Sequence, residues 1–153
     1  MSRRILVAVL VGLGGLVSLD GCGRRLPPVV PVQGTVLVNG KPLPKASVTF
    51  VPQLDRFGAE SNSSAVTDEN GRFTLTCAYN DQPGAVVAKH VVLVAEAPLP
   101  EDLRRVQDGQ AIDRYRATLG NRPIPPQYSS VNQSPIRMEI KEGQEPVTIE
   151  LTR

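Results

Sequence analysis

The chain has 153 residues, 41% of them hydrophobic and 21% charged, and its formal net charge at pH 7 is +2. This length suits one domain with its own hydrophobic core. The near-neutral charge gives no electrostatic reason to expect nucleic acid as a partner, and a single histidine excludes a His-based metal cluster within one chain.

The N-terminus has the organisation of an export signal. Arg3 and Arg4 come first, and the run from Ile5 to Leu19 carries no charge. This run is shorter than the roughly 20 residues that span a bilayer, and its glycines disfavour a buried helix. The pattern predicts a signal peptide over residues 1–21. The paired arginines also resemble a twin-arginine export signal, although ordinary export is favoured.

The residues before Cys22 resemble the lipobox of bacterial lipoproteins. Leu19 and Gly21 match the apolar and small residues of that motif, whereas Asp20 departs from its usual small or apolar residue. The resemblance implies that a signal peptidase recognises Leu19 and Gly21, that cleavage occurs before Cys22, and that Cys22 is the lipid attachment site. Because two or three acyl chains anchor a protein stably, we expect an exported protein held at the cell envelope, on the inner or the outer membrane.

The second cysteine is expected to be structural. In the segment RFTLTCA, Phe73, Leu75 and Cys77 alternate with polar residues and therefore share one face of a strand. Cys77 is predicted to be a small buried hydrophobe, because the sequence places no cation or helix N-terminus beside it. A disulfide between Cys22 and Cys77 is the alternative if the lipobox is not used.

Short β patterns follow a proline-rich segment. Residues 22–31 contain GRRLPPVVP, which favours an extended tether behind the lipid. Seven strands are then predicted, in VQGTVLV, ASVTFVP, SSAVT, RFTLTCA, AVVAKHVVLVAEA, IRMEIK and PVTIELT. Turn signals such as Asn39-Gly40 separate them. The spacing predicts an all-β fold over residues 32–153, a seven-stranded antiparallel β-sandwich.

Residues 98–123 break this pattern between the fifth and sixth strands. Pro100, Glu101 and Asp102 form a favourable first helical turn, and apolar residues then recur at helical spacing. One or two short amphipathic helices are predicted as an insert. Its charges are mixed, which favours a solvated face over an anion site. The arginines concerned are Arg104, Arg105, Arg114, Arg116 and Arg122.

Three stretches resemble carboxypeptidase regulatory-like domains. VQGTVLVNGKPLPKASVTFVP is similar to their opening hairpin, VTDENGRFTL to their second hairpin, and PGAVVAKHVVLV to a later strand. The ending IPPQYSSVNQSPIRMEIKEGQEPVTIELT is similar to the tail of small bacterial lipoproteins that carry this domain. The resemblance implies a transthyretin-like (prealbumin-like) sandwich that serves as a non-catalytic module.

The residues that could be reactive are expected to have structural roles. His90 is expected to pack at the edge of the core beside Val92 and Val94 rather than to act as a base. Asp68 is expected to cap the turn Asp68-Glu69-Asn70-Gly71, which lacks the ligand spacing of an EF-hand. No hydrolase or nucleotide-binding signature occurs in the sequence. We therefore predict no catalytic residue, cofactor or metal.

These patterns predict a non-enzymatic, membrane-anchored lipoprotein of the cell envelope, with a structural role or an envelope protein as its partner. The alternative is an extracellular carbohydrate-binding module. Glycan sites usually offer aromatic faces, and the chain has no tryptophan and only three tyrosines, Tyr79, Tyr115 and Tyr128. The first hypothesis is therefore preferred.

Overall fold

The structure, a computed structural model, describes residues 25–106 and 108–153. The predicted signal peptide, with Leu19 and Gly21, and the predicted lipid attachment site Cys22 lie outside the described residues. Within them the fold is mostly β, as expected, with eleven strands in three sheets, two α-helices and two 3₁₀-helices. Among the described helices, none has the length and apolar character that a membrane span requires.

The largest sheet has five antiparallel strands. Their order is β10 (Arg137–Glu139), β9 (Lys89–Glu96), β4 (Ala46–Pro52), β5 (Ser63–Val66) and β7 (Thr76–Cys77). Strand β4 is predicted correctly over all its residues, and Ala46, Val48 and Phe50 on one of its faces are fully buried. Alternation decides this burial because successive side chains of a strand point to opposite faces.

The second sheet is built around β2 (Gln33–Val38). Strand β11 (Val147–Leu151) lies on one side of β2, and β3 (Lys41–Pro42) and β6 (Arg72–Thr74) lie on the other. The pair β11–β2 is parallel, so the expectation of an entirely antiparallel fold is wrong at this pair. The alternation of β11 predicted its buried face, but it carries no information on the direction of a neighbour that lies more than a hundred residues away.

Two of the predicted strands are each divided into two. RFTLTCA forms β6, which pairs with β2, and β7, which pairs with β5 of the other sheet. The chain crosses between the sheets at Leu75, whose N–H donates to Val32 O at 3.0 Å. The long segment AVVAKHVVLVAEA forms β8 (Ala85–Val86) and then β9. Strand β8 pairs with β1 (Val29–Val30), so part of the proline-rich segment belongs to a small third sheet.

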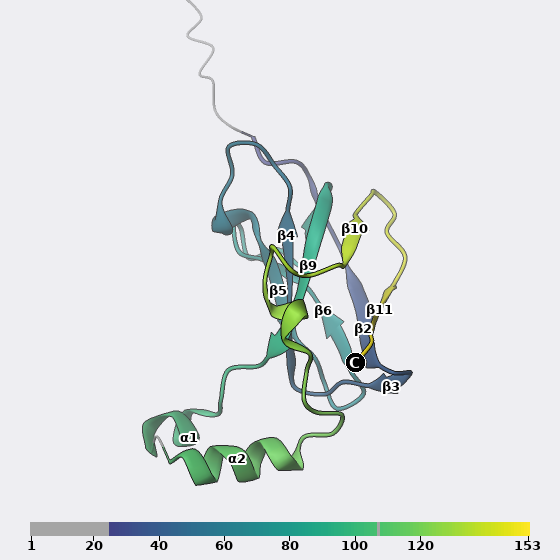
Figure 1. The fold of residues 1–153 in the computed structure, drawn as a ribbon. Helices are drawn as coiled ribbons and strands as arrows, with labels where there is room; N and C mark the ends of the chain where they lie inside the picture. The colour runs from purple at the N-terminus through teal and green to yellow at the C-terminus, as the bar shows by residue number, and fades with distance from the viewer. Residues whose placement is uncertain (1–24, 107) are drawn as a thin grey trace, which may run out of the picture.

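One hydrophobic core joins the two larger sheets. The rings of Phe50 and Phe73, which come from different sheets, lie with their centroids 6.3 Å apart. Cys77 and Leu75 are fully buried on the same face as Phe73, as predicted. The core also takes in Val36, Val38, Val48, Val92, Val94, Ile149 and Leu151. Figure 1 shows the strands gathered around this core.

The predicted insert consists of two helices, α1 (Glu101–Val106) and α2 (Gly109–Thr118). Asp108 caps α2, because its carboxylate accepts the N–H of Gln110 at 2.9 Å. Neither helix has a buried residue in its described part. Figure 1 shows both helices at one end of the β structure, and the 3₁₀-helix η2 (Pro126–Ser129) returns the chain to the core.

Candidate functional site

The single histidine lies in the core. His90 is 0% exposed, and its ring centroid lies 5.6 Å from that of Phe50. Nε2 donates to Val86 O at 2.9 Å, whereas Nδ1 has no hydrogen-bond partner. Val92 and Val94 are buried on the same face, so the prediction that His90 is a packed histidine sharing their face of the strand is confirmed.

Burial also determines the charge state of this ring. Desolvation lowers the pKa of His90 below 6.5, although the backbone of Val86 and Phe50 opposes this shift. The imidazole is therefore neutral near pH 7. A depression of about 430 Å³ lined by Gln53, Lys89 and Met138 borders the buried His90. No serine hydroxyl of the described chain is hydrogen-bonded to His90, so no nucleophile is paired with it.

The acidic turn before β6 is closed by its own backbone. Asp68 Oδ1 accepts the N–H groups of Asn70 and Arg72, each at 2.8 Å. The predicted capping role of Asp68 is therefore confirmed. Within the described residues, no group of three His, Cys, Asp or Glu side chains is arranged to hold a metal ion.

Cys77 is a free, fully buried cysteine. Its N–H donates to Gln82 O at 2.9 Å, and its carbonyl accepts the N–H of Asp81 at 2.9 Å. Because the side chain is enclosed, an external thiol can reach it only after this part of the core opens. The sulfur fills core space as the alternation predicted.

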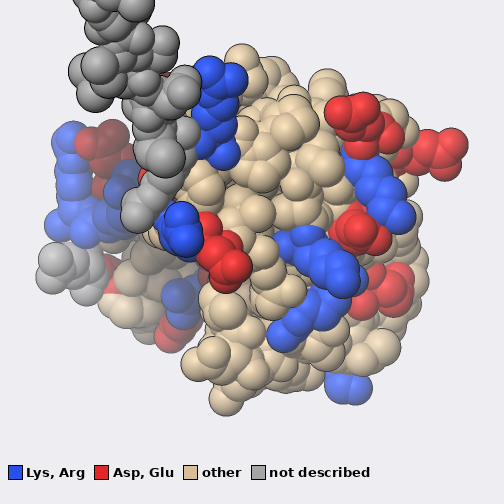
Figure 2. Space-filling view, turned by 90° about the horizontal axis from the view of Figure 1, so that it is seen from above, with Lys and Arg blue, Asp and Glu red and all other residues tan. Residues whose placement is uncertain are grey.

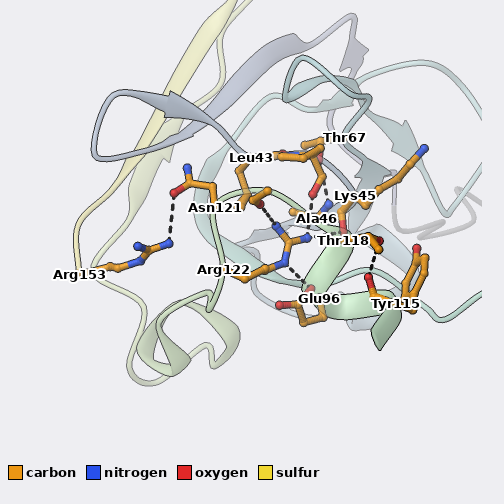
Figure 3. Close-up of polar contacts among 12 residues, drawn as sticks. Leu43, Lys45, Ala46, Thr67, Glu96, Tyr115, Thr118, Asn121, Arg122 and Arg153 are labelled. Carbon is orange, nitrogen blue, oxygen red and sulfur yellow. Dashed lines mark hydrogen bonds and ion pairs between the residues drawn. The ribbon is translucent and has the colours of Figure 1, made fainter. Parts of the chain in front are cut away.

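One arginine that the sequence predicts on a solvated face instead makes several hydrogen bonds to distant parts of the chain. Arg122 follows the helices, and its side chain is only 10% exposed. Its Nε donates to Glu96 at 2.8 Å, and one terminal nitrogen donates to the carbonyls of Pro44 and Lys45 at 2.7 and 3.0 Å. Figure 3 shows this guanidinium between the end of β9 and the loop that leads into β4.

Asn121 extends the same contact. Its Nδ2 donates to Lys41 O at 2.9 Å and Val38 O at 3.1 Å, and its Oδ1 accepts from Arg153 at 3.1 Å. Its φ of 65° places it in the left-handed region, which asparagine tolerates better than most residues. Asn121 and Arg122 together, here called the insert clamp, fasten the exit of the insert to the β2–β3 hairpin, the β3–β4 loop and the end of β9.

The β3–β4 loop is held from its other side by Thr67. The hydroxyl of Thr67 donates to Leu43 O at 2.7 Å and accepts the N–H of Ala46 at 2.9 Å. These two hydrogen bonds hold the loop on either side of the Pro44 and Lys45 carbonyls that Arg122 binds. The arrangement positions a structural element, and it contains no group placed for acid–base or nucleophilic chemistry.

The remaining arginines of the insert behave as predicted. Arg104, Arg105, Arg114 and Arg116 are exposed, and Arg105 and Arg114 bind Glu101 and Gln110 one helical turn away. Arg122 alone was assigned wrongly. A residue before proline avoids helical backbone, which offers a weak sign that Arg122 leaves the helix, but its partners are 77 and 78 residues earlier and no local pattern identifies them.

Comparison with known proteins finds no relative. The chain matches no protein-family model, and no curated protein or solved structure is significantly similar to it.

Proposed function

We propose that this protein is a non-enzymatic lipoprotein of the cell envelope, whose β domain is a structural or protein-interaction module. The observation that carries the proposal is the order of its N-terminal sequence: basic residues, a short apolar run, and Leu19-Asp20-Gly21 before Cys22. A signal of this kind places a lipid on the cysteine thiol and provides the anchor that the apolar run is too short to provide.

The state of the domain's reactive groups supports a role without catalysis. His90 is buried and neutral near pH 7, the carboxylate of Asp68 is engaged by backbone N–H groups, and Cys77 is enclosed. The side chains of the insert clamp direct their donors at main-chain carbonyls and at Glu96. These groups are occupied in stabilising the domain.

We further propose that the domain is a seven-stranded sandwich of the transthyretin-like kind. Support comes from the core shared by the two larger sheets and from the agreement of the seven predicted segments with the strands. When β6 is joined to β7 and β8 to β9, these segments remain, and β1 and β3 are short additions. The carbohydrate-binding alternative has less support, because Tyr128 is 4% exposed and its hydroxyl is bonded to Thr152.

The lipid anchor can be tested on the full chain expressed in bacteria. We expect the mature protein to begin at Cys22, to carry acyl groups detectable by mass spectrometry, and to sediment with membranes. Cys22→Ser should abolish acylation and release the protein from the membrane fraction, because no second thiol lies at the cleavage site. Cys77→Ala is the matched control and should remain acylated.

Two results would contradict the proposal. One is a wild-type protein whose leader is intact and whose Cys22 thiol is free. The other is a disulfide between Cys22 and Cys77, which non-reducing peptide mapping would detect.

A further inference from the structure

The chain enters the domain close to the predicted lipid. Strand β1 pairs with β8, and the N–H of Val87 donates to Pro28 O at 2.9 Å, so the chain is held from Pro28 onward. Val30 packs against the core, and Val32 is 1% exposed. From Cys22 to Pro28 there are six residues, which extend over at most about 20 Å. On a lipid anchor at Cys22, this end of the domain cannot move far from the bilayer.

The insert lies at the opposite end. Strand β9 begins at Lys89, shortly after β8, which pairs with β1 where the chain enters the domain. It ends at Glu96, which binds Arg122 at the exit of the insert. Eight residues of extended strand span roughly 24 Å. Figure 1 shows the same arrangement, with the described chain beginning at one end and α1 and α2 at the other.

The surface around the chain entry carries an exposed aromatic residue. Tyr79 is 54% exposed and lines a depression of about 380 Å³ together with Leu26, Pro27 and Val29. Arg25, Pro28, Asn80 and Gln82 also line it. Figure 2 views the molecule from this end and shows uncharged residues over much of the face, with cations and anions interspersed. Tyrosine favours the boundary between water and hydrocarbon, because its ring is apolar and its hydroxyl is polar.

We propose that this surface, here called the entry face, lies against the headgroup layer of the bilayer, with Tyr79 in contact with the lipids. The insert then projects from the far end, where it is accessible to other envelope components. The inference rests on the lipid anchor proposed above. The bilayer is chosen as the occupant because the short segment between Cys22 and Pro28 ends on this face, beside Tyr79.

The orientation can be measured with single tryptophans, because the chain has none of its own. The variants Tyr79→Trp, on the entry face, and Tyr115→Trp, on α2, form a matched pair. Each mature lipidated protein is added to preformed phosphatidylcholine vesicles whose acyl chains are brominated near the headgroup. We expect bromine to quench the indole of the Tyr79→Trp variant by about twofold or more, and that of Tyr115→Trp little, because the indole at the interface meets the lipids.

The outcomes distinguish failure of the proposed orientation from failure of the lipid anchor. Mass spectrometry and vesicle flotation first establish that both variants carry lipid and are bound. If they are bound but quenching is equal, or stronger for Tyr115→Trp, the proposed orientation is wrong and the lipid anchor stands. If neither variant is acylated or floats, the lipid anchor and the orientation fail together.

Discussion

Arg122 is the side chain on which the attachment of the insert depends. A guanidinium has five N–H donors in a planar fork, and here they reach Glu96 and the carbonyls of Pro44, Lys45 and Gly120. Lysine offers one ammonium group at the end of a flexible chain and cannot reproduce the set. Replacing Arg122 with lysine would therefore leave main-chain carbonyls without these donors at a partly buried site.

We therefore predict that Arg122→Lys lowers the free energy of unfolding by about 1–3 kcal/mol. The matched control is Arg114→Lys, on the exposed surface of α2, where Arg114 donates to Gln110. That substitution should change stability by less than about 0.5 kcal/mol. Urea denaturation followed by circular dichroism measures both values. Equal losses would show that the insert clamp contributes nothing beyond an exposed arginine.

His90 shows what a residue's own pattern can establish. Its place in KHVVLV puts it on the face of Val92 and Val94, and this was enough to predict burial. The hydrogen bond from Nε2 to Val86 depends on how the chain runs between β8 and β9, which the pattern did not reveal. The lowered pKa of His90 follows from its burial, and the hydrogen bond to Val86 opposes that shift.

At the scale of the element, the turn before β6 depends on a glycine. Gly71 has φ 71°, and its carbonyl accepts the N–H of Val36 at 2.8 Å. A Cβ at this position would lie 2.6 Å from Val36 O and 2.9 Å from Leu43 N. The turn thus needs glycine both for its backbone conformation and for the close approach of β2.

Gly40 has the first of these two requirements, the left-handed backbone, without the second. Its φ is 75°, but a Cβ there would meet nothing within 4 Å. Gly40→Ala should therefore cost only the left-handed conformation, about 1–2 kcal/mol. Gly71→Ala should cost at least about 3 kcal/mol, because the strain and the collision with the backbone add. Thermal and urea unfolding of the two variants tests this order, and similar losses would contradict it.

The segment RFTLTCA is divided into the strands β6 and β7, which belong to different sheets. Its alternation is unbroken, so the segment looks like one strand, and the burial of Phe73, Leu75 and Cys77 agrees with that pattern. The change of sheet at Leu75 leaves the buried face unchanged, because both halves point into the same core. The periodicity of the segment therefore cannot reveal where the chain changes from one sheet to the other.

At the scale of the whole molecule, the insert is an appendage to the β domain. Its helices bury no residue, and the insert clamp supplies the contacts of its exit with the β domain. Stability should accordingly reside in the two larger sheets and their shared core.

Replacing residues 101–118 with a Gly/Ser linker of the same length should lower the unfolding free energy by less than about 1 kcal/mol, because no core contact is lost. Asn121→Ala in the intact chain should cost more, about 1–2 kcal/mol, since carbonyls lose their donor and alanine is strained at φ 65°. Denaturant midpoints compare the two variants. Loss of folding in the linker variant would show that the helices are part of the core structure.

The sequence by itself determined which strand faces are buried, where the turns and the insert fall, and the roles of Asp68 and Cys77. These features follow from residue periods and turn chemistry that act over a few positions. It also supports the prediction of a lipid on Cys22, which the described residues do not include. Only the tertiary structure decided the parallel pairing of β11 with β2, the change of sheet at Leu75 and the partners of Arg122. Such contacts join residues far apart in the chain, and their choice depends on how whole elements pack rather than on any local pattern.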